Sequence, residues 1–306
     1  MTFYNLSEEM GNSLKTILNK LSNKERDYRL NLSSITWINY HKINGITKSI
    51  GYGFNSDKNI YPASIVKLAY GLATYKWIEE GKLEYSDDIR NAVYKMLYFS
   101  SNDATSYIVD LLSGTTSGSS LNGNSWKDWK YQRSIINDWL KELNWDELQN
   151  INCCQKTWED GPYGREKDFY GINNENINLM STDGTARILE EIMNNLSYEK
   201  ENVNLIEYLS RSLSKDLIKK DPLNQIEGFL GEGLPENTRY WSKAGLMSKV
   251  RHDAAWWKQD EFTDTLLVVF GNSNKFVKDK SFLPRLAHEI FHVNKKSINL
   301  QESYYQ

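Results

Sequence analysis

The amino-acid sequence predicts an α/β fold in two lobes, one built from both ends of the chain and one all-helical lobe inserted between them. Strand-like runs are confined to residues 32–54 and 239–270, and helical periodicity dominates the stretch between them. Strands far apart in sequence bury their apolar faces by sharing one sheet, so the two ends are expected to form one lobe. The predicted lobes are 1–61 with 215–306 (α/β) and 62–214 (all-α).

The composition is that of a packed globular protein. The 306 residues include 10 Trp and 19 Tyr, which favours a large apolar core. The net charge of −3 and the lack of a long basic cluster argue against nucleic acid as a partner. No apolar run approaches the roughly 18 residues that span a bilayer, so no membrane span is expected.

Neither the N-terminus nor the cysteines identify a compartment. Residues 1–9 lack the cationic start and apolar centre of a signal peptide. The chain is therefore expected to be cytoplasmic as written, or periplasmic if a leader precedes it. Cys153 and Cys154 are adjacent, which suits neither a framework disulfide nor a paired metal site, so reduced thiols are expected.

The N-terminal part predicts one helix and a strand hairpin. Residues from about 7 to 24 carry apolar side chains at every third or fourth position, the pattern of an amphipathic helix. Strand-like runs follow at 32–40 and 47–54, and Asn44-Gly45 between them is a turn signal. A hairpin that leads into the first long helix is expected.

The middle of the chain predicts helices joined by polar loops. Apolar spacing predicts helices over about 64–78, 89–99, 104–112, 129–143, 181–192 and 203–218. A loop rich in Gly, Ser and Thr spans 113–120, and one rich in Asn and Gly spans 150–180. These segments together make the inserted all-α lobe.

The C-terminal third changes to strand periodicity. Strands are predicted at 239–243, 252–257 and 263–270, the last of them a continuous apolar run that suits a buried strand. A final helix is predicted from about 282 to 293. These strands are expected to join the N-terminal hairpin in one sheet.

The sequence Pro62-Ala63-Ser64-Ile65-Val66-Lys67 opens the helix around which the chain is organised. Ser64 and Lys67 are three residues apart, which puts them on one helix face. A lysine among apolar neighbours tends to lose its charge, and a neutral amine can accept the proton of a serine hydroxyl. The alternative is a surface lysine one turn after a capping serine.

Two further motifs are ambiguous when each is taken alone. Ser100-Ser101-Asn102 follows an apolar run at a helix junction, where Ser and Asn commonly cap the next helix. Trp241-Ser242-Lys243-Ala244-Gly245 ends a strand-like run and could be a strand edge with a solvated lysine. The order S-x-x-K, S-x-N and K-x-G is the reason to consider them together.

This set of motifs resembles that of the penicillin-recognising serine hydrolases, and most of all class A β-lactamases. The resemblance runs from about Leu32 to the last helix, and Ser181-Thr182-Asp183-Gly184 is similar to the helix start that follows the family's active-site loop. It implies a two-lobed β-lactamase/transpeptidase-like fold, with an antiparallel sheet flanked by helices and an inserted all-α lobe.

The resemblance also implies a role for individual residues. Ser64 would be the acylated nucleophile, Lys67 would help to deprotonate it, and Ser100 would relay a proton to the leaving nitrogen. Asn102 would bind the substrate's side-chain amide, and the substrate would lie along the strand at Lys243. The remaining residues implied to bind substrate are Ala244, Gly245, Leu246, whose backbone N–H would form the oxyanion hole with that of Ser64, and Arg251, a candidate for the substrate carboxylate.

The sequence departs from the class A pattern in three places. Ser101 stands where these enzymes usually carry aspartate, and Ala244 where they carry threonine or serine. The loop expected to supply the deacylating base lacks the family's E-x-x-L-N pattern. Glu166 is the best candidate for that base, with Asp168 or a purely structural loop as the alternatives.

His288-Glu289-Ile290-Phe291-His292 matches the H-E-x-x-H signature of zinc proteases. The apolar stripe of this helix, however, leaves His288, Glu289 and His292 on the polar side, and only 14 residues follow. No metal site and no cofactor are therefore predicted.

The sequence thus predicts a β-lactamase-like serine hydrolase that acts through an acyl-enzyme on β-lactam amide bonds. A DD-peptidase or related amidase or esterase is the first alternative, and a penicillin-binding protein that deacylates slowly is the second. The expected partner is a small-molecule or peptide-like amide substrate, and a monomer is expected. The natural substrate and the rate of turnover stay open.

Overall fold

The computed structural model describes residues 3–22, 33–43, 45–196, 203–221, 223–259 and 263–304. Backbone contacts divide the chain into two compact units. One, the α/β unit, comprises Met1–Lys58 and Ser210–Gln306, and the other, the helical unit, comprises Asn59–Leu209. The boundaries between the units follow residues 58 and 209, whereas the predicted boundaries between the lobes follow residues 61 and 214.

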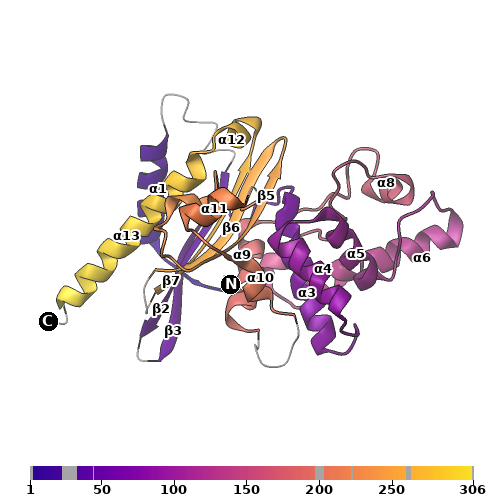
Figure 1. Cartoon of the computed structure of the whole chain (residues 1–306), viewed down its shortest axis with the longest axis horizontal. Coiled ribbons are helices and arrows are strands. Elements are labelled where there is room, and N and C mark those ends of the chain that lie inside the picture. The colour runs from indigo at the N-terminus through magenta and orange to yellow at the C-terminus, as the bar shows by residue number, and fades with distance from the viewer. Residues whose placement is uncertain are drawn as a thin grey trace. The chain divides into compact units, whose positions relative to one another are not determined.

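The α/β unit is built on a single sheet with the strand order β1-β3-β2-β7-β6-β5-β4 (Figure 1). The strands are β1 (Asn5–Leu6), β2 (Ser33–Ile43), β3 (Ile46–Phe54), β4 (Ser210–Arg211), β5 (Tyr240–Met247), β6 (Val250–Lys258) and β7 (Thr263–Asn272). Every neighbouring pair is antiparallel except β1 and β3, which are parallel. The N-terminal hairpin therefore shares its sheet with the C-terminal strands, as the sequence predicts.

Helices α1 (Glu8–Leu21) and α13 (Phe282–Tyr304) cover one face of this sheet (Figure 1). Their apolar side chains form one core cluster with alternate residues of the strands, among them Trp37, Tyr240 and Trp257. Ser7 begins α1 by accepting a hydrogen bond from the Met10 N–H at 3.2 Å. The unit also contains α11 (Lys215–Lys220), η3 (Leu230–Gly233) and α12 (Asn274–Lys278).

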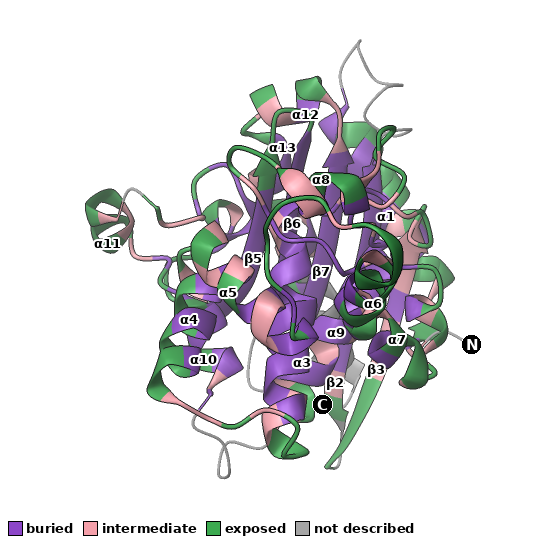
Figure 2. Ribbon diagram, turned by 90° about the vertical axis from the view of Figure 1, so that its right-hand side faces the viewer, coloured by how far each residue is buried: buried purple, intermediate pink, exposed green. Residues whose placement is uncertain are grey.

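The helical unit is arranged around α3 (Lys67–Glu79), which is buried along almost its whole length (Figure 2). Helices α4, α5 and α9 pack against α3. The elements of this unit besides α3 are η1 (Ala63–Val66), α4 (Asp87–Tyr98), α5 (Asn102–Ser113), α6 (Gly123–Arg133), α7 (Ile135–Glu142), η2 (Asp146–Leu148), α8 (Gly164–Tyr170), α9 (Thr182–Asn194) and α10 (Leu205–Leu209). A helix buried on all sides explains why the first long apolar run shows no polar face.

Some predicted elements differ from the structure. The helix predicted over 203–218 is wrong as a continuous element, because β4 separates α10 from α11. The helix predicted over 129–143 is two helices that meet at Ser134, and the loop predicted over 150–180 contains α8. Residues 23–24, Leu32 and Asn44, which belong to predicted elements, lie outside the described residues.

The fold class and the length and hydropathy of the helices can both be compared with the sequence-based expectations. The α/β fold class, with a sheet flanked by helices and a separate helical unit, is confirmed. Within the described ranges, none of the helices is both long enough and apolar enough to cross a bilayer.

Candidate active site

Ser64 lies in η1, the short turn of helix that leads into α3. Its side chain is half-buried, whereas Ala63, Ile65 and Val66 around it are buried. Ala63 has a φ of 48°, in the left-handed region that residues with a Cβ seldom adopt. Strain of this kind concentrates at functional sites, because the surrounding structure must hold it in place.

Lys67, one turn after Ser64, is completely buried. Its Nζ donates to the Ser100 carbonyl oxygen at 2.5 Å and to Asn102 Oδ1 at 2.9 Å, and lies 3.2 Å from Ser100 Oγ. All of these oxygens are uncharged. Within the described ranges no hydrogen bond joins Lys67 Nζ to Ser64 Oγ.

Burial lowers the pKa of Lys67 to about 7, while the negative charge of Glu159 acts in the opposite direction. At neutral pH a large fraction of the molecules therefore carries Lys67 as a neutral amine. Such an amine has a lone pair that can accept a proton.

Ser100 connects α4 to α5 and has a φ of 60°. Its neighbour Ser101 caps α5, because Ser101 Oγ accepts a hydrogen bond from the Ala104 N–H at 3.1 Å. The capping role considered from the sequence is thus taken by Ser101. Ser100 and Asn102 instead direct oxygen atoms to Lys67.

Thr157 is a contact of this site that the sequence did not single out. Its Oγ1 donates to Asn102 Oδ1 at 2.8 Å, so that oxygen accepts from both Thr157 and Lys67. With the amide oxygen held by two donors, the Asn102 Nδ2 group is the part of the amide that faces away from them. No sequence pattern announces Thr157, because it belongs to an irregular segment.

Glu166, the predicted deacylating base, lies elsewhere in the helical unit. It is completely buried, and its Oε1 accepts hydrogen bonds from Arg133 and Ser117, each at 2.8 Å. Its Oε2 is buried and has no hydrogen-bond partner among the residues that the structure describes. A base must reach water, so this placement argues against Glu166 in that role; the exposed Glu159 is the carboxylate whose charge acts on Lys67.

In the α/β unit, Lys243 lies on β5 and is completely buried. It pairs with Ala254 of β6, and its Nζ donates to the Ala244 carbonyl oxygen at 2.8 Å and to Gln225 Oε1 at 3.2 Å. Two residues on, Gly245 pairs with His252, so these side-chain positions share one face of the sheet. Leu246, next along β5, is half exposed.

Arg251 lies on the opposite face of the sheet from Lys243. It pairs with Leu246, and strand alternation places that pair on the face opposite Lys243. Its guanidinium donates to the Gly228 carbonyl oxygen at 3.1 Å and to the Val277 carbonyl oxygen at 3.0 Å. These contacts give Arg251 a structural role, so it is left out of the substrate-binding residues.

A buried carboxyl group lies beside the K-x-G motif. Asp253 pairs with Ala244, and its Oδ2 accepts from the Leu230 N–H at 2.9 Å and from the Tyr240 hydroxyl at 3.2 Å. Burial raises the pKa of Asp253 to about 7, although these hydrogen bonds and Lys243 act in the opposite direction. Asp253 therefore exchanges a proton near neutral pH.

The H-E-x-x-H motif lies on the outer side of α13. His288 and His292 are exposed, and the carboxylate of Glu289 forms an ion pair with Lys20 at 2.7 Å. No group of three or more metal-ligating side chains occurs in the parts of the chain that the structure describes.

The fold of both units together is that of class A β-lactamases and of PBP-A. The chain is similar to the structure of PBP-A, with a TM-score of 0.61, 13% identity and coverage of 97% of this chain and 100% of the other. It is similar to a β-lactamase from Sphaerobacter thermophilus, with a TM-score of 0.57, 14% identity and coverage of 92% and 97%. A β-lactamase from Burkholderia vietnamiensis gives a TM-score of 0.57, 9% identity and coverage of 94% and 97%.

Sequence comparison adds nothing to this likeness. No family model matches the chain, and no curated protein matches it. The family resemblance stated from the three motifs is thus confirmed at the level of the fold.

Proposed function

We propose that this chain is a serine hydrolase that opens β-lactam amide bonds through an acyl-enzyme on Ser64. The observation that carries the proposal is the environment of Lys67. It is buried one turn after Ser64, its pKa is about 7, and its Nζ contacts the Ser100 carbonyl oxygen, Ser100 Oγ and Asn102 Oδ1. Such an amine can act as a base at neutral pH.

Acylation then proceeds in two proton transfers. The Ser64 hydroxyl loses its proton to Lys67 as the Oγ–C bond forms at the β-lactam carbonyl. The C–N bond of the ring breaks, and the proton passes from Lys67 through the Ser100 hydroxyl to the departing nitrogen. Asn102 Nδ2 donates to the amide of the substrate's side chain.

The α/β unit contributes the remaining substrate contacts in this proposal. The ammonium of Lys243 attracts the substrate carboxylate, and Ala244 and Gly245 let the substrate lie along β5. In the helical unit, the backbone N–H group of Ser64 is a candidate donor to the oxyanion, whose stabilisation is usually the largest contribution in acyl transfer. Ala244 lacks the hydroxyl found at this position in the family, and its side chain is buried in the core cluster of the α/β unit.

Deacylation requires a base that activates water, and we assign this role to Glu159 rather than to Glu166. Glu159 is exposed, and its charge acts on Lys67, whereas Glu166 is buried among cations. An exposed carboxylate is held less firmly than a buried one. Because a displacement of about 1 Å can cost on the order of 10² in rate, slow deacylation is expected.

A penicillin-binding protein that deacylates slowly is the second candidate function. The observation that favours it is that Lys67 has no carboxylate within hydrogen-bond distance among the described residues. One of the similar structures is a PBP-A variant described as an acyl-enzyme complex with penicillin G, at 13% identity and a TM-score of 0.60. DD-peptidase or related amidase or esterase activity would use the same acylation step.

Mass spectrometry of the protein mixed with penicillin G tests the proposal. We expect one covalent equivalent, mapped to the peptide that contains Ser64, and a burst followed by slow turnover. Ser64→Ala should abolish the adduct, whereas Ser120→Ala, which alters an exposed loop serine, should leave it unchanged. An adduct on another residue, or none at all, would refute the assignment.

A further inference from the structure

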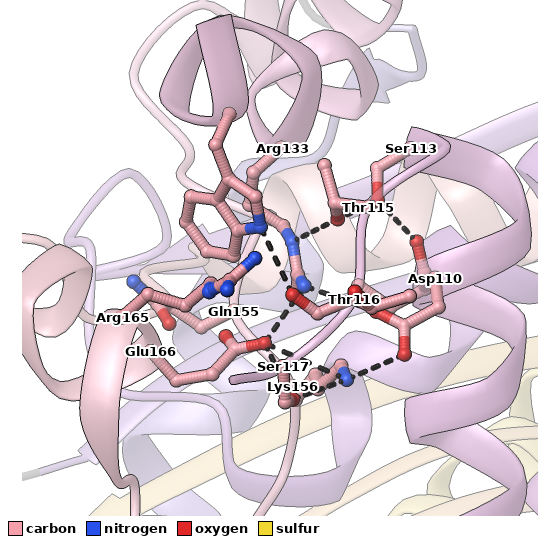
Figure 3. A network of polar contacts seen from close by, with 12 residues as sticks. Asp110, Ser113, Thr115, Thr116, Ser117, Arg133, Gln155, Lys156, Arg165 and Glu166 are labelled. Atoms are coloured by element: carbon pink, nitrogen blue, oxygen red, sulfur yellow. Dashed lines mark hydrogen bonds and ion pairs between the residues drawn. The ribbon is translucent and has the colours of Figure 1, made fainter. Parts of the chain in front are cut away.

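Four charged side chains meet inside the helical unit, far along the chain from Ser64. Asp110 belongs to α5, Arg133 ends α6, Lys156 precedes the segment 157–165, and Glu166 belongs to α8. Arg133 and Glu166 are completely buried, and Lys156 is 4% exposed. Figure 3 shows these side chains converging, and they are called the buried charge cluster below.

The four side chains of the buried charge cluster form ion pairs with one another. Arg133 Nη2 lies 2.8 Å from Glu166 Oε1 and 3.0 Å from Asp110 Oδ1. Lys156 Nζ lies 2.7 Å from Asp110 Oδ2 and 3.5 Å from Glu166 Oε1. Each cation thus contacts both anions, and the two positive and two negative charges cancel. Buried charges persist in proteins when they are paired in this way.

Neighbouring segments are fixed to the same cluster. Ser117 Oγ donates to Glu166 and accepts from Lys156, each at 2.8 Å, and Arg133 Nε donates to Thr115 Oγ1 at 2.8 Å (Figure 3). The start of α8 also packs directly on this loop. A Cβ at Gly164 would lie 2.1 Å from the Gly118 carbonyl oxygen, so only glycine fits there.

The position of the cluster along the chain connects it with the candidate active site. Lys156 and Glu166 flank the segment 157–165. Their ion pair therefore brings the two ends of this segment together. Within that segment, Thr157 donates to Asn102, and Glu159 is the carboxylate whose charge acts on Lys67. The two residues that flank the segment, Lys156 and Glu166, are buried, while Glu159 itself is exposed.

We propose that the buried charge cluster positions the segment 157–165 against Asn102 and Lys67, and so sets the rate of deacylation. The inference rests on the proposed function, because the rate that the cluster sets is the rate at which the proposed acyl-enzyme on Ser64 is hydrolysed. The members of the buried charge cluster are positioning residues, because they act on Thr157 and Glu159 through the backbone of the segment and not through side-chain contacts. In this proposal Glu166 lies in the loop expected to supply the base, but its side chain pairs with Arg133 and Lys156 and accepts a hydrogen bond from Ser117.

Backbone hydrogen exchange of Glu166→Gln, followed by mass spectrometry without any substrate, tests the positioning directly. The substitution keeps the shape of the side chain but leaves the two cations with one anion. We expect exchange over residues 157–163 to become at least tenfold faster. The neutral double variant Glu166→Gln with Arg133→Gln should recover part of the lost protection. Unchanged exchange in Glu166→Gln would overturn the inference.

The kinetic arm separates positioning from a general loss of folding. In Glu166→Gln, deacylation of the penicillin G adduct should slow by about tenfold while acylation changes less than twofold. Asp128→Asn, which removes an exposed carboxylate from α6, serves as the matched control and should behave as the wild type. Equal losses in acylation and deacylation would contradict positioning. If the wild type forms no adduct, the proposed function fails, and the exchange experiment still decides whether the cluster positions the segment.

Discussion

Two lysines of the helical unit are both buried, but their surroundings differ in how they compensate the charge. Lys67 donates to the uncharged oxygens of Ser100 and Asn102, and burial lowers its pKa to about 7. Lys156 contacts the carboxylates of Asp110 and Glu166. An ammonium that burial leaves without an anion becomes a base, whereas one that is paired becomes part of the scaffold.

Because of this difference, Lys67 suits a role in proton transfer and Lys156 suits a structural role. The proton of Lys67 can leave at neutral pH, so Lys67 suits proton transfer with Ser64. The ion pairs of Lys156 with Asp110 and Glu166 suit a structural role that holds the chain on either side of it. The comparison can be tested by replacing each of the two lysines, then by removing carboxylates, and then by changing the pH.

Replacing the two lysines by methionine should give opposite results. Lys67→Met should slow acylation of Ser64 by on the order of 10² or more, the usual contribution of a positioned proton acceptor. Lys156→Met should leave Asp110 and Glu166 with one cation and reduce the free energy of unfolding by about 3–5 kcal/mol. Stopped-flow acylation and urea unfolding measure the two effects. Equal acylation rates in the two variants would contradict the distinction between Lys67 as a proton acceptor and Lys156 as a structural residue.

Removing carboxylates should distinguish the base from the scaffold. Glu159→Gln should slow deacylation by about tenfold, less than the usual ~10²–10⁴-fold contribution of a general base, because the side chain is exposed. Unfolding of this variant should match the wild type, unlike that of Glu166→Gln. The decay of the adduct by mass spectrometry measures the rate. Normal decay in Glu159→Gln would mean that another group activates water.

Asp253 extends the comparison to a buried carboxyl group that forms hydrogen bonds but no ion pair within the described part of the chain. Its pKa is raised to about 7 from an ordinary value of 3.8, so between these pH values the folded protein binds the extra proton. The contribution of Asp253 to stability is therefore complete below about pH 4 and declines as pH rises through 7, by at most ~1.4 kcal/mol per pH unit. Asp253→Asn should flatten this dependence, as measured by thermal unfolding from pH 4 to 8. An identical pH profile in the variant would contradict the assignment.

The four candidate residues around Lys67 come from two short motifs. Ser64 and Lys67 are one helical turn apart, and Ser100 and Asn102 are two residues apart; each motif is ambiguous alone, and the resemblance to the class A pattern is what grouped them. The change from strand to helix periodicity in the sequence falls close to the boundaries between the two compact units.

Contacts that depend on long-range packing were not predictable from one sequence. The resemblance made Arg251 a candidate for the substrate carboxylate, but the strand register puts its side chain on the face opposite Lys243. Glu166 was chosen by its place in the loop, yet its surroundings come from α5 and α6. Thr157 is 55 residues from its partner Asn102, and no periodic pattern connects them.

The pH dependence of Ser64 acylation tests most directly whether Lys67 acts as a neutral amine. The rate constant for adduct formation with penicillin G would be measured by stopped flow and mass spectrometry from pH 5 to 10. Since Lys67 loses its proton near pH 7, the rate constant should rise with pH, with a midpoint near 7 and a plateau above about 8. A rate constant that is flat across this range, or that rises only toward pH 10, would contradict the account.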